Sequence, residues 1–381
     1  MAHRMRDGAA DHQHSIRGAS LVRQPDMAES VRSNPEMRRY KVMAVEIASE
    51  RAIDRRIYIE ELAPWLPARI IDCHVHVGLK EFWGPVSPER ARSIWALEVA
   101  QENSWEDFRR TCSSLFPEQR VSVIAFASVA REVDIESANE YVRAGVADPA
   151  NDAVGLFATR PEWDAGLIRD AMLQGFKGIK PYPDLAMKDT LETSIYDFLP
   201  REHLAALDEF GGILMLHLPR SGRLADPDNV REVLEISDTY PDVAIILAHV
   251  GRAYGLTTAK RGLPHFIDRD SVYFDISANL NADVFQCALE TIGPGRLLYG
   301  SDLPVTLMRG VREHFGEHYV NYTDGPYSWN THRKSAEEEA SYTYYLYEQL
   351  RSLVSAIKKT GLGRDACDRV LYSNCARLIG R

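Results

Sequence analysis

Eight short, largely apolar runs recur between residues 69 and 302, and stretches with helical character separate them. Runs that are apolar throughout are typical of strands buried on both faces, as in a parallel sheet. Eight such strands alternating with helices predict an α/β fold, namely a distorted (β/α)8 TIM barrel. An open doubly wound sheet is the alternative, but no glycine-rich turn follows the first run, Arg69–Val77. The other runs are Val121–Val129, Ala153–Thr159, Gly175–Pro181, Gly212–Leu218, Val243–Val250, Ser271–Ser277 and Arg296–Asp302.

Helices are expected between and after these runs. The candidates are Ile135–Ala147, Glu162–Leu173, Glu202–Phe210, Pro227–Tyr240, Ala282–Ile292 and Glu337–Lys359. Two further segments, 78–120 and 303–335, are long loops in this interpretation. Both follow the carboxyl end of a strand, where barrel enzymes carry their active sites, so we expect them to form walls or lids over a site.

The residues before the barrel divide into two parts. Residues 1–36 are polar and aperiodic, which predicts a disordered tail. Residues 37–68 are expected to form a helical N-terminal extension, because some of their apolar residues follow helical spacing. The barrel domain then occupies residues 69–381.

The charge and the cysteines limit the classes of partner. With 55 acidic and 45 basic residues, the chain is acidic overall, which argues against binding to nucleic acid. No apolar stretch approaches the ~20 residues needed to cross a bilayer, so no membrane partner is expected. The N-terminus lacks the apolar core of a secretory signal, and the five cysteines are odd in number with no C-x-x-C spacing. These features favour a cytoplasmic protein with free thiols.

Histidines and an aspartate stand at the carboxyl ends of four of the predicted strands. The first strand ends Asp72-Cys73-His74-Val75-His76, and residues i and i+2 of a strand share a face, so both histidines can reach one ion. Cys73, at the opposite parity, is expected to face the helices. Strands five, six and eight end in His217, His249 and Asp302 respectively. Because strand ends converge at the mouth of a barrel, a His₃-Asp metal site with room for water is expected there.

Each of these residues also has a structural interpretation. A single strand-end histidine is more often hydrogen-bonded in the core, and an aspartate after Gly-Ser is usually a turn or cap residue. The coincidence of suitable ligands on four strands favours the metal site. Asp275, near the end of strand seven, could orient one of the histidines from behind.

The motifs together resemble the amidohydrolase superfamily. Asp72-x-His74-x-His76, the strand ends LMLHLPR and IILAHVGR, and Gly300-Ser301-Asp302 are similar to its amidohydrolase-related branch, which includes aminocarboxymuconate-semialdehyde decarboxylase and several lactonases. The resemblance covers roughly residues 69–381. It implies an enzyme with a metal site at the carboxyl mouth of the barrel, and a homodimer is common in that branch.

The resemblance also implies roles for the site residues. His74, His76, His217 and Asp302 would bind one divalent metal, expected to be Zn²⁺ with Mn²⁺ or Fe²⁺ as alternatives. Asp302 would also accept the proton of a metal-activated water. His249 would be either a ligand of a second metal or a general acid and base.

Basic residues near the same strand ends suggest an anionic small-molecule substrate. Lys180, at the end of strand four, could be a carbamoylated metal bridge, a partner for a substrate carboxylate, or a lysine without a catalytic role. Arg220 and Arg252 could hold a carboxylate in a bidentate manner, and Tyr182 lies close to Lys180 in sequence.

Three functions follow from these residues. The first is a metal-dependent hydrolase of an amide, lactone or related bond in a carboxylate-bearing molecule. The second is a non-oxidative decarboxylase of an aromatic or enoic acid that uses the same metal site. A catalytically dead barrel that acts as a binding protein is the remote third.

Overall fold

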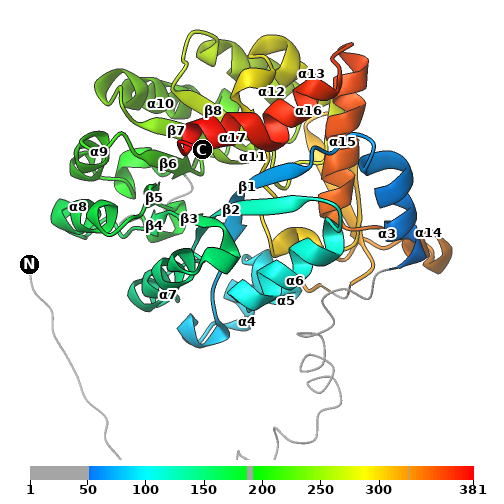
Figure 1. The fold of residues 1–381 in the computed structure, drawn as a ribbon, viewed down its shortest axis with the longest axis horizontal. Coiled ribbons are helices and arrows are strands. Elements are labelled where there is room, and N and C mark those ends of the chain that lie inside the picture. The colour runs from blue at the N-terminus through cyan, green and yellow to red at the C-terminus, as the bar shows by residue number, and fades with distance from the viewer. Residues whose placement is uncertain (1–50, 187–191, 326) are drawn as a thin grey trace, which may run out of the picture. The chain divides into compact units, whose positions relative to one another are not determined.

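The eight predicted strands all form and lie in parallel around one barrel (Figure 1). The computed structural model describes residues 51–186, 192–325 and 327–381. A break at Leu156 divides the third barrel strand into β3 and β4. The strands are β1 (Arg69–His76), β2 (Arg120–Phe126), β3 (Ala153–Gly155), β4 (Phe157–Ala158), β5 (Gly178–Lys180), β6 (Ile213–Leu216), β7 (Ala244–Leu247), β8 (Val272–Asp275) and β9 (Leu297–Leu298).

Hydrogen bonds close the ring of strands. The backbone N–H of Leu156 donates to the carbonyl of Ala125 over 2.9 Å and so spans the break in the third strand. On the other side, the chain that continues from β9 pairs with β1: Cys73 donates to Tyr299 over 2.9 Å, and Asp302 donates to His74 over 2.8 Å. The predicted TIM barrel is therefore confirmed, and its seam lies between the first and last strands.

The main helices surround the strands and agree closely with the prediction (Figure 1). Helix α7 has the predicted bounds, and it begins where the side chain of Asp134 accepts a hydrogen bond from Ser137 N–H. Helix α10 begins with the Asp226 side chain as its cap and Pro227 at its first position. The outer helices are α7 (Ile135–Ala147), α8 (Ala165–Leu173), α9 (Arg201–Asp208), α10 (Pro227–Thr239), α12 (Leu256–Gly262), α13 (Ala282–Thr291) and α15 (Tyr345–Lys359).

Short helical segments complete the chain. Two of them, α16 (Arg364–Asp368) and α17 (Asn374–Leu378), flank the turn η10 (Arg369–Ser373) near the C-terminus. The other single turns are η2 (Lys80–Phe82), η3 (Pro149–Asn151), η4 (Pro183–Leu185), η5 (Ile195–Asp197), η6 (Arg223–Ala225), η7 (Leu263–Phe266), η8 (Pro294–Arg296) and η9 (Val305–Leu307). In the described part of the chain, no helix has the length and apolar character that a bilayer-spanning segment needs.

The barrel interior is filled by alternate residues of the strands. One buried cluster takes Ile71 and Cys73 from β1, Ile124 and Phe126 from β2, a similar pair from β6, and Ile246 from β7. Cys73 therefore packs with the interior cluster, and the expectation that it faces the helices is wrong. The reason is a bulge, because the pairing of β1 with β2 shifts register between Asp72 and Val75.

The segment 78–120 is not the irregular loop expected from the sequence. It contains α4 (Pro88–Ala91), α5 (Trp95–Val99) and α6 (Trp105–Leu115). Ser104 caps α6, and its partner Asp107 bonds back to the backbone of Ser104, which is the reciprocal arrangement of a capping box. The first insertion is thus a helical wall beside the barrel mouth.

The segment 303–335 likewise contains regular structure. Strands β10 (Gly310–Phe315) and β11 (His318–Thr323) form an antiparallel hairpin, with Phe315 opposite His318. The two-residue turn between them needs a left-handed residue, which Gly316 supplies at φ +64°. The polar and aromatic sequence of the hairpin lacks the long apolar run of a buried strand, so this segment was predicted as a loop.

The predicted helix Glu337–Lys359 is divided in two. Helix α14 (Ala336–Ala340) ends before Ser341, and α15 begins at Tyr345. Between them, the carbonyl of Thr343 accepts a hydrogen bond of 3.1 Å from the N–H of Gly310. This contact with the hairpin replaces a helical hydrogen bond, so tertiary structure overrides the local helical pattern.

The N-terminal extension is helical in its described part. Residues 1–50, which include the predicted tail and the start of the extension, lie outside the described residues. After them come α3 (Ala52–Ile57) and the helical turn η1 (Tyr58–Leu62). The buried carboxylate of Asp54 accepts two bonds, of 2.7 and 2.6 Å, from the guanidinium of Arg309, and one of 2.7 Å from Thr343 Oγ1. The extension is therefore fastened to the base of the hairpin.

Candidate metal centre

The side chains of three predicted residues converge at the barrel mouth. The Nε2 atoms of His74 and His76, at the end of β1, each lie 3.5 Å from Oδ1 of Asp302, which follows β9. The side chain of His74 is 1% exposed, whereas those of His76 and Asp302 are 21% and 16% exposed. The cluster is thus partly open to solvent, through His76 and Asp302, as a site that admits a small molecule must be.

The backbone around Gly300-Ser301-Asp302 explains why this sequence stands at the seam. A Cβ at position 300 would lie 2.7 Å from the Cβ of His74, so only glycine permits the two strands to approach this closely. The N–H of Ser301 donates to Asp72 Oδ1 over 2.8 Å. Asp302 itself has a left-handed backbone, with φ 61°. The Gly300-Ser301-Asp302 sequence therefore lets the backbones approach closely, and this directs the Asp302 side chain toward the histidines.

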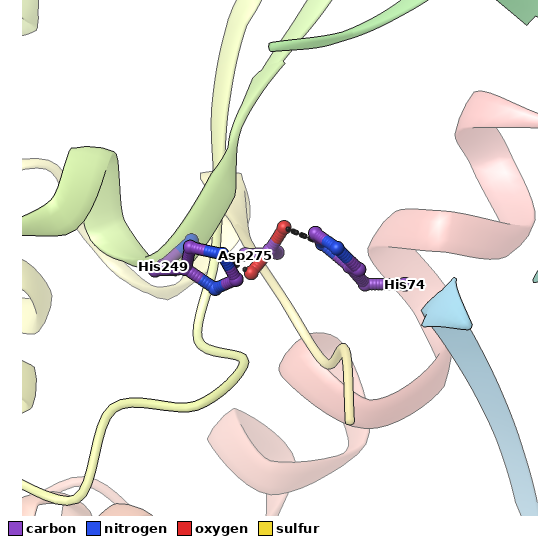
Figure 2. A group of neighbouring side chains, drawn as sticks. All are labelled: His74, His249 and Asp275. Atoms are coloured by element: carbon purple, nitrogen blue, oxygen red, sulfur yellow. Dashed lines mark hydrogen bonds and ion pairs between the residues drawn. The ribbon is translucent and has the colours of Figure 1, made fainter. Parts of the chain in front are cut away.

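Asp275 orients His74 from behind. Figure 2 shows its carboxylate beside the two histidine rings, and Oδ2 lies 2.9 Å from Nδ1 of His74. Oδ1 accepts a hydrogen bond of 2.9 Å from the backbone N–H of His249. Burial raises the pKa of Asp275, but the charge and hydrogen bond of His74 lower it more, so the net shift is downward. An ionised Asp275 holds the Nδ1 proton and leaves Nε2 of His74 to face the cluster.

His249 adjoins the cluster in an unusual backbone conformation. The segment Ala248–Arg252, labelled α11 in Figure 1, contains three consecutive left-handed residues with φ of 58°, 53° and 60° at His249, Val250 and Gly251. Nδ1 of His249 lies 3.0 Å from the carbonyl oxygen of Ser277, which accepts a hydrogen bond from it. The ring lies 5.1 Å from that of His74. Left-handed conformations are costly for a β-branched residue such as valine, so this turn is a strained feature at the site.

His217 lies outside the groups of possible ligands that the other histidines form. It follows β6, and its ring lies 5.5 Å from that of His249 but is not within the three-ligand groups formed by the described residues. Its Nδ1 is buried and has no hydrogen-bond partner among those residues. Burial, together with the charge of Arg252, lowers the pKa of His217 well below the usual range. A neutral imidazole with an unsatisfied buried nitrogen suits a ligand position.

The electrostatics of the cluster suit a divalent cation. Burial lowers the pKa of His74 to about 4, and the charge of Lys180 acts in the same direction. Burial also raises the pKa of Asp302, but the hydrogen bond with His76 and the charge of His74 outweigh it, so the net shift is downward. Neutral imidazoles and an ionised carboxylate are the forms that bind metals. His74, His76 and Asp302, with His217 and His249 nearby, therefore fit the predicted ion.

Lys180 is buried inside the mouth, and the charges of Asp275 and Asp302 act on it from beyond ion-pair distance. Its side chain is 1% exposed, and Nζ lies 4.8 Å from the ring centroid of Phe126 and 5.8 Å from that of Tyr182. No acidic side chain in the described ranges forms an ion pair with it. Burial lowers the pKa of Lys180 to about 8, although the charge of Asp275 opposes this shift.

The other predicted substrate-binding residues differ in the partners that already occupy their polar groups. Arg220 faces acidic side chains at 3.4 to 4.0 Å, namely Glu192, Asp226 and Asp228. One terminal nitrogen of Arg252 donates to the carbonyl of Leu218 over 2.8 Å, which fixes the loop after β6. The ring of Tyr182 lies 5.1 Å from that of His217, and burial raises the pKa of Tyr182 to about 12.

Three residues of the site were not predicted from the sequence. Phe126 packs its ring 5.1 Å from His74 and 4.8 Å from His76, but an aromatic residue in an apolar run looks like ordinary core. Ser277 holds His249, and it ends the predicted strand Ser271–Ser277, where a search for polar strand ends would have found it. Tyr254, whose ring lies 6.4 Å from that of His249, sits in a loop and had no such signal.

Replacing Asp275 with asparagine should weaken zinc binding by about 10–100-fold, because an amide does not hold His74 in the same proton arrangement. Competition with a chelating dye of known zinc affinity measures the effect. Asp283→Asn is the matched control, since the Asp283 side chain lies on α13 and is 58% exposed. Equal zinc affinity in the Asp275 variant and the wild type would contradict this role.

Comparison with known proteins supports one family and one fold. Residues 71–326 match the family model described as amidohydrolase. An amidohydrolase from Burkholderia multivorans with bound zinc is 16% identical with a TM-score of 0.53, and the match covers 82% of this chain and 99% of that one. A 2,6-dihydroxybenzoate decarboxylase from Rhizobium is 15% identical with a TM-score of 0.50, over 82% of this chain and 99% of that one. A comparison with curated protein sequences gives no match.

Proposed function

The chain belongs to the amidohydrolase family, and we infer that it is a metal-dependent hydrolase of an amide, lactone or related bond in a small carboxylate-bearing molecule. One observation carries the inference. His74, His76 and Asp302 come from the two strands that meet at the barrel seam, and their ligand atoms lie within 4.8 Å of one another. Such a convergence on a half-open mouth favours chemistry at one bound ion.

In this proposal His74, His76, His217 and Asp302 hold one Zn²⁺, and Mn²⁺ or Fe²⁺ could be held by the same donors. The ion supplies Lewis acidity, which polarises a carbonyl group and makes water more acidic. The side chains on the open side of the cluster then decide which molecule is bound and where protons go.

Asp302 is the proton acceptor for the attacking water. Its hydrogen bond with His76 and its downward pKa shift support an ionised carboxylate that accepts a proton. His249 is held through Nδ1 by Ser277, so its Nε2 is the atom left to exchange a proton with the leaving group or to donate to a developing oxyanion. Asp275 keeps His74 and His249 in place through hydrogen bonds to each.

Lys180 binds a carboxylate of the substrate. A buried ammonium that touches no carboxylate is costly, so an incoming anion that pairs with Lys180 directly gains binding energy. Phe126 and Tyr182 give this position an apolar and aromatic lining. Carbamoylation of Lys180 is the alternative, and a count of two metals per chain would support it.

Decarboxylation of an aromatic or enoic acid is the second candidate function. The aromatic rings beside Lys180 favour it, because they would place an unsaturated carbon skeleton next to the carboxylate that leaves. In that reaction Lys180 and Tyr182 would orient the carboxylate, and His249 would supply the proton that replaces it at carbon.

Metal analysis and turnover together test the proposal. The purified protein should contain about one zinc per chain, removal by a chelator should abolish hydrolysis of lactone or amide substrates, and added zinc should restore it. His76→Ala should lose both metal and activity, while His265→Ala, an exposed histidine of η7, should lose neither. Release of carbon dioxide from aromatic acids without hydrolysis would support the decarboxylase. A folded protein that binds no metal and is indifferent to His76→Ala would contradict both functions.

A further inference from the structure

Tyr254 forms a wall of the mouth next to the metal cluster. Its ring lies 6.4 Å from the ring of His249 at an interplanar angle of 25°. Beyond it stands the hairpin, whose Tyr319 ring lies 5.4 Å from that of Tyr254. One aromatic ring therefore separates the cluster from the hairpin.

Two arginine side chains approach this ring from different parts of the chain. The guanidinium carbon of Arg223, in η6, lies 5.1 Å from the ring centroid of Tyr254. The guanidinium carbon of Arg312, in β10, lies 5.3 Å from the same centroid and 4.5 Å from that of Tyr319. Contact with aromatic faces stabilises a guanidinium while leaving its N–H edges free for an anion.

Among the residues that the structure describes, the hydrogen-bond partners of Arg312 are neutral. Its Nε donates to the amide oxygen of Asn321 and a terminal nitrogen donates to the carbonyl of Ala278, each over 2.8 Å. Its positive charge is oriented by these bonds but is not compensated. The side chain is half-buried, so this charge has lost part of its hydration.

Arg223 contrasts with its neighbour Arg220. Arg220 faces three acidic side chains, whereas Arg223 forms no ion pair with any acidic side chain in the part of the chain that the structure describes. Arg223 is half-buried as well. Two partly desolvated guanidinium groups lie around one ring, and neither has an ion-pair partner among the described residues, so the region favours an anion.

We propose that Arg223 and Arg312 form a second anion-binding subsite, which takes a second carboxylate of the substrate. The proposal rests on the function inferred above and narrows its substrate class to dicarboxylates. One carboxylate pairs with Lys180 inside the mouth, and the body of the molecule lies along Tyr254. The other carboxylate accepts hydrogen bonds from the two guanidinium groups.

The docked hairpin completes this subsite. Glu317, at the hairpin turn, accepts hydrogen bonds from the N–H groups of Thr257 and Thr258 over 2.8 and 3.2 Å. These bonds fasten the hairpin to the start of α12, beside the loop that carries Tyr254. Arg312 is thereby held beside the ring of Tyr254, which Arg223 also approaches.

Calorimetric titration of the zinc-loaded protein with isophthalate and with benzoate tests the proposal. These probes share an aromatic carboxylate and differ in the second one. Isophthalate should bind at least about tenfold more tightly than benzoate, which is the contribution expected of a charge-assisted pair. Arg223→Gln/Arg312→Gln should remove this preference and leave benzoate binding unchanged. Arg201→Gln, which removes an arginine 3.9 Å from the ring of Tyr196 on the outer wall, should leave both affinities unchanged.

Several outcomes would overturn the subsite. They are no preference for isophthalate in the wild type, no binding of either probe at millimolar concentration, and a preference that survives the double substitution. None of these depends on turnover. The proposed function fails separately, if the protein takes up no metal or if His76→Ala has no effect on metal content.

Discussion

Replacing Asp302 with asparagine should lower kcat by about 10²–10⁴-fold for any substrate that the wild type turns over, because an amide cannot accept the proton of the attacking water. The substitution keeps the size of the side chain. Asparagine also tolerates the left-handed backbone at this position, where φ is 61°. The loss should therefore come from chemistry and metal binding, with a circular dichroism spectrum like that of the wild type.

Asp152→Asn is the matched control for that experiment. Asp152 is also a left-handed aspartate, with φ 45°, but it precedes β3 and so lies at the opposite end of the barrel. There it accepts hydrogen bonds of 2.8 Å from Ser122 and from Arg381. Comparable losses of kcat in the two variants would show that backbone disturbance, and not proton transfer, explains the effect at Asp302.

Replacing Asp54 with alanine should lower the free energy of unfolding by roughly 3–5 kcal/mol, because it leaves the Arg309 guanidinium buried without its partner. The side chains of Asp54 and Arg309 are 2% and 9% exposed, so water cannot substitute for the lost carboxylate. Denaturant unfolding followed by tryptophan fluorescence measures the change.

A second ion pair of the same extension provides the control. Glu61 lies 2.7 Å from Arg351 of α15, but both side chains are well exposed, at 42% and 37%. Glu61→Ala should cost less than about 1 kcal/mol. Asp54→Ala/Arg309→Met should recover much of the stability lost in Asp54→Ala, since it removes the unpaired charge as well. Equal effects of the Asp54 and Glu61 substitutions would contradict the special place of the buried pair.

The strands and most helices could be predicted because local pattern and burial agree there. A parallel strand buried on both faces has an apolar sequence that nothing else in the chain imitates. The start of helix α7 is also marked in the sequence by its N-cap residue, Asp134. The hairpin β10–β11 gives no such signal, because polar and aromatic residues cover both of its strands. The break before α15 depends on Gly310 and Asp54, which are distant in sequence from Thr343.

The candidate metal ligands could be predicted from the sequence. Whether the arginines around them have acidic partners could not. Parity along a strand brings His74 and His76 to one side, and strand ends supply the other donors. Whether an arginine is free depends on its neighbours in space: Arg220 has acidic partners and Arg312 has none among the described residues. No spacing rule in the sequence separates these two cases.

The position of the candidate metal ligands at the barrel seam means that they are translated at very different times. Asp72 and Ser301, which join the two strands at the centre, are 229 residues apart in sequence. A ribosome that has made only the first strands has exposed two histidines but neither Asp302 nor the chain that closes the ring. An ion held by all of the proposed ligands would therefore bind only after nearly the whole barrel has been translated.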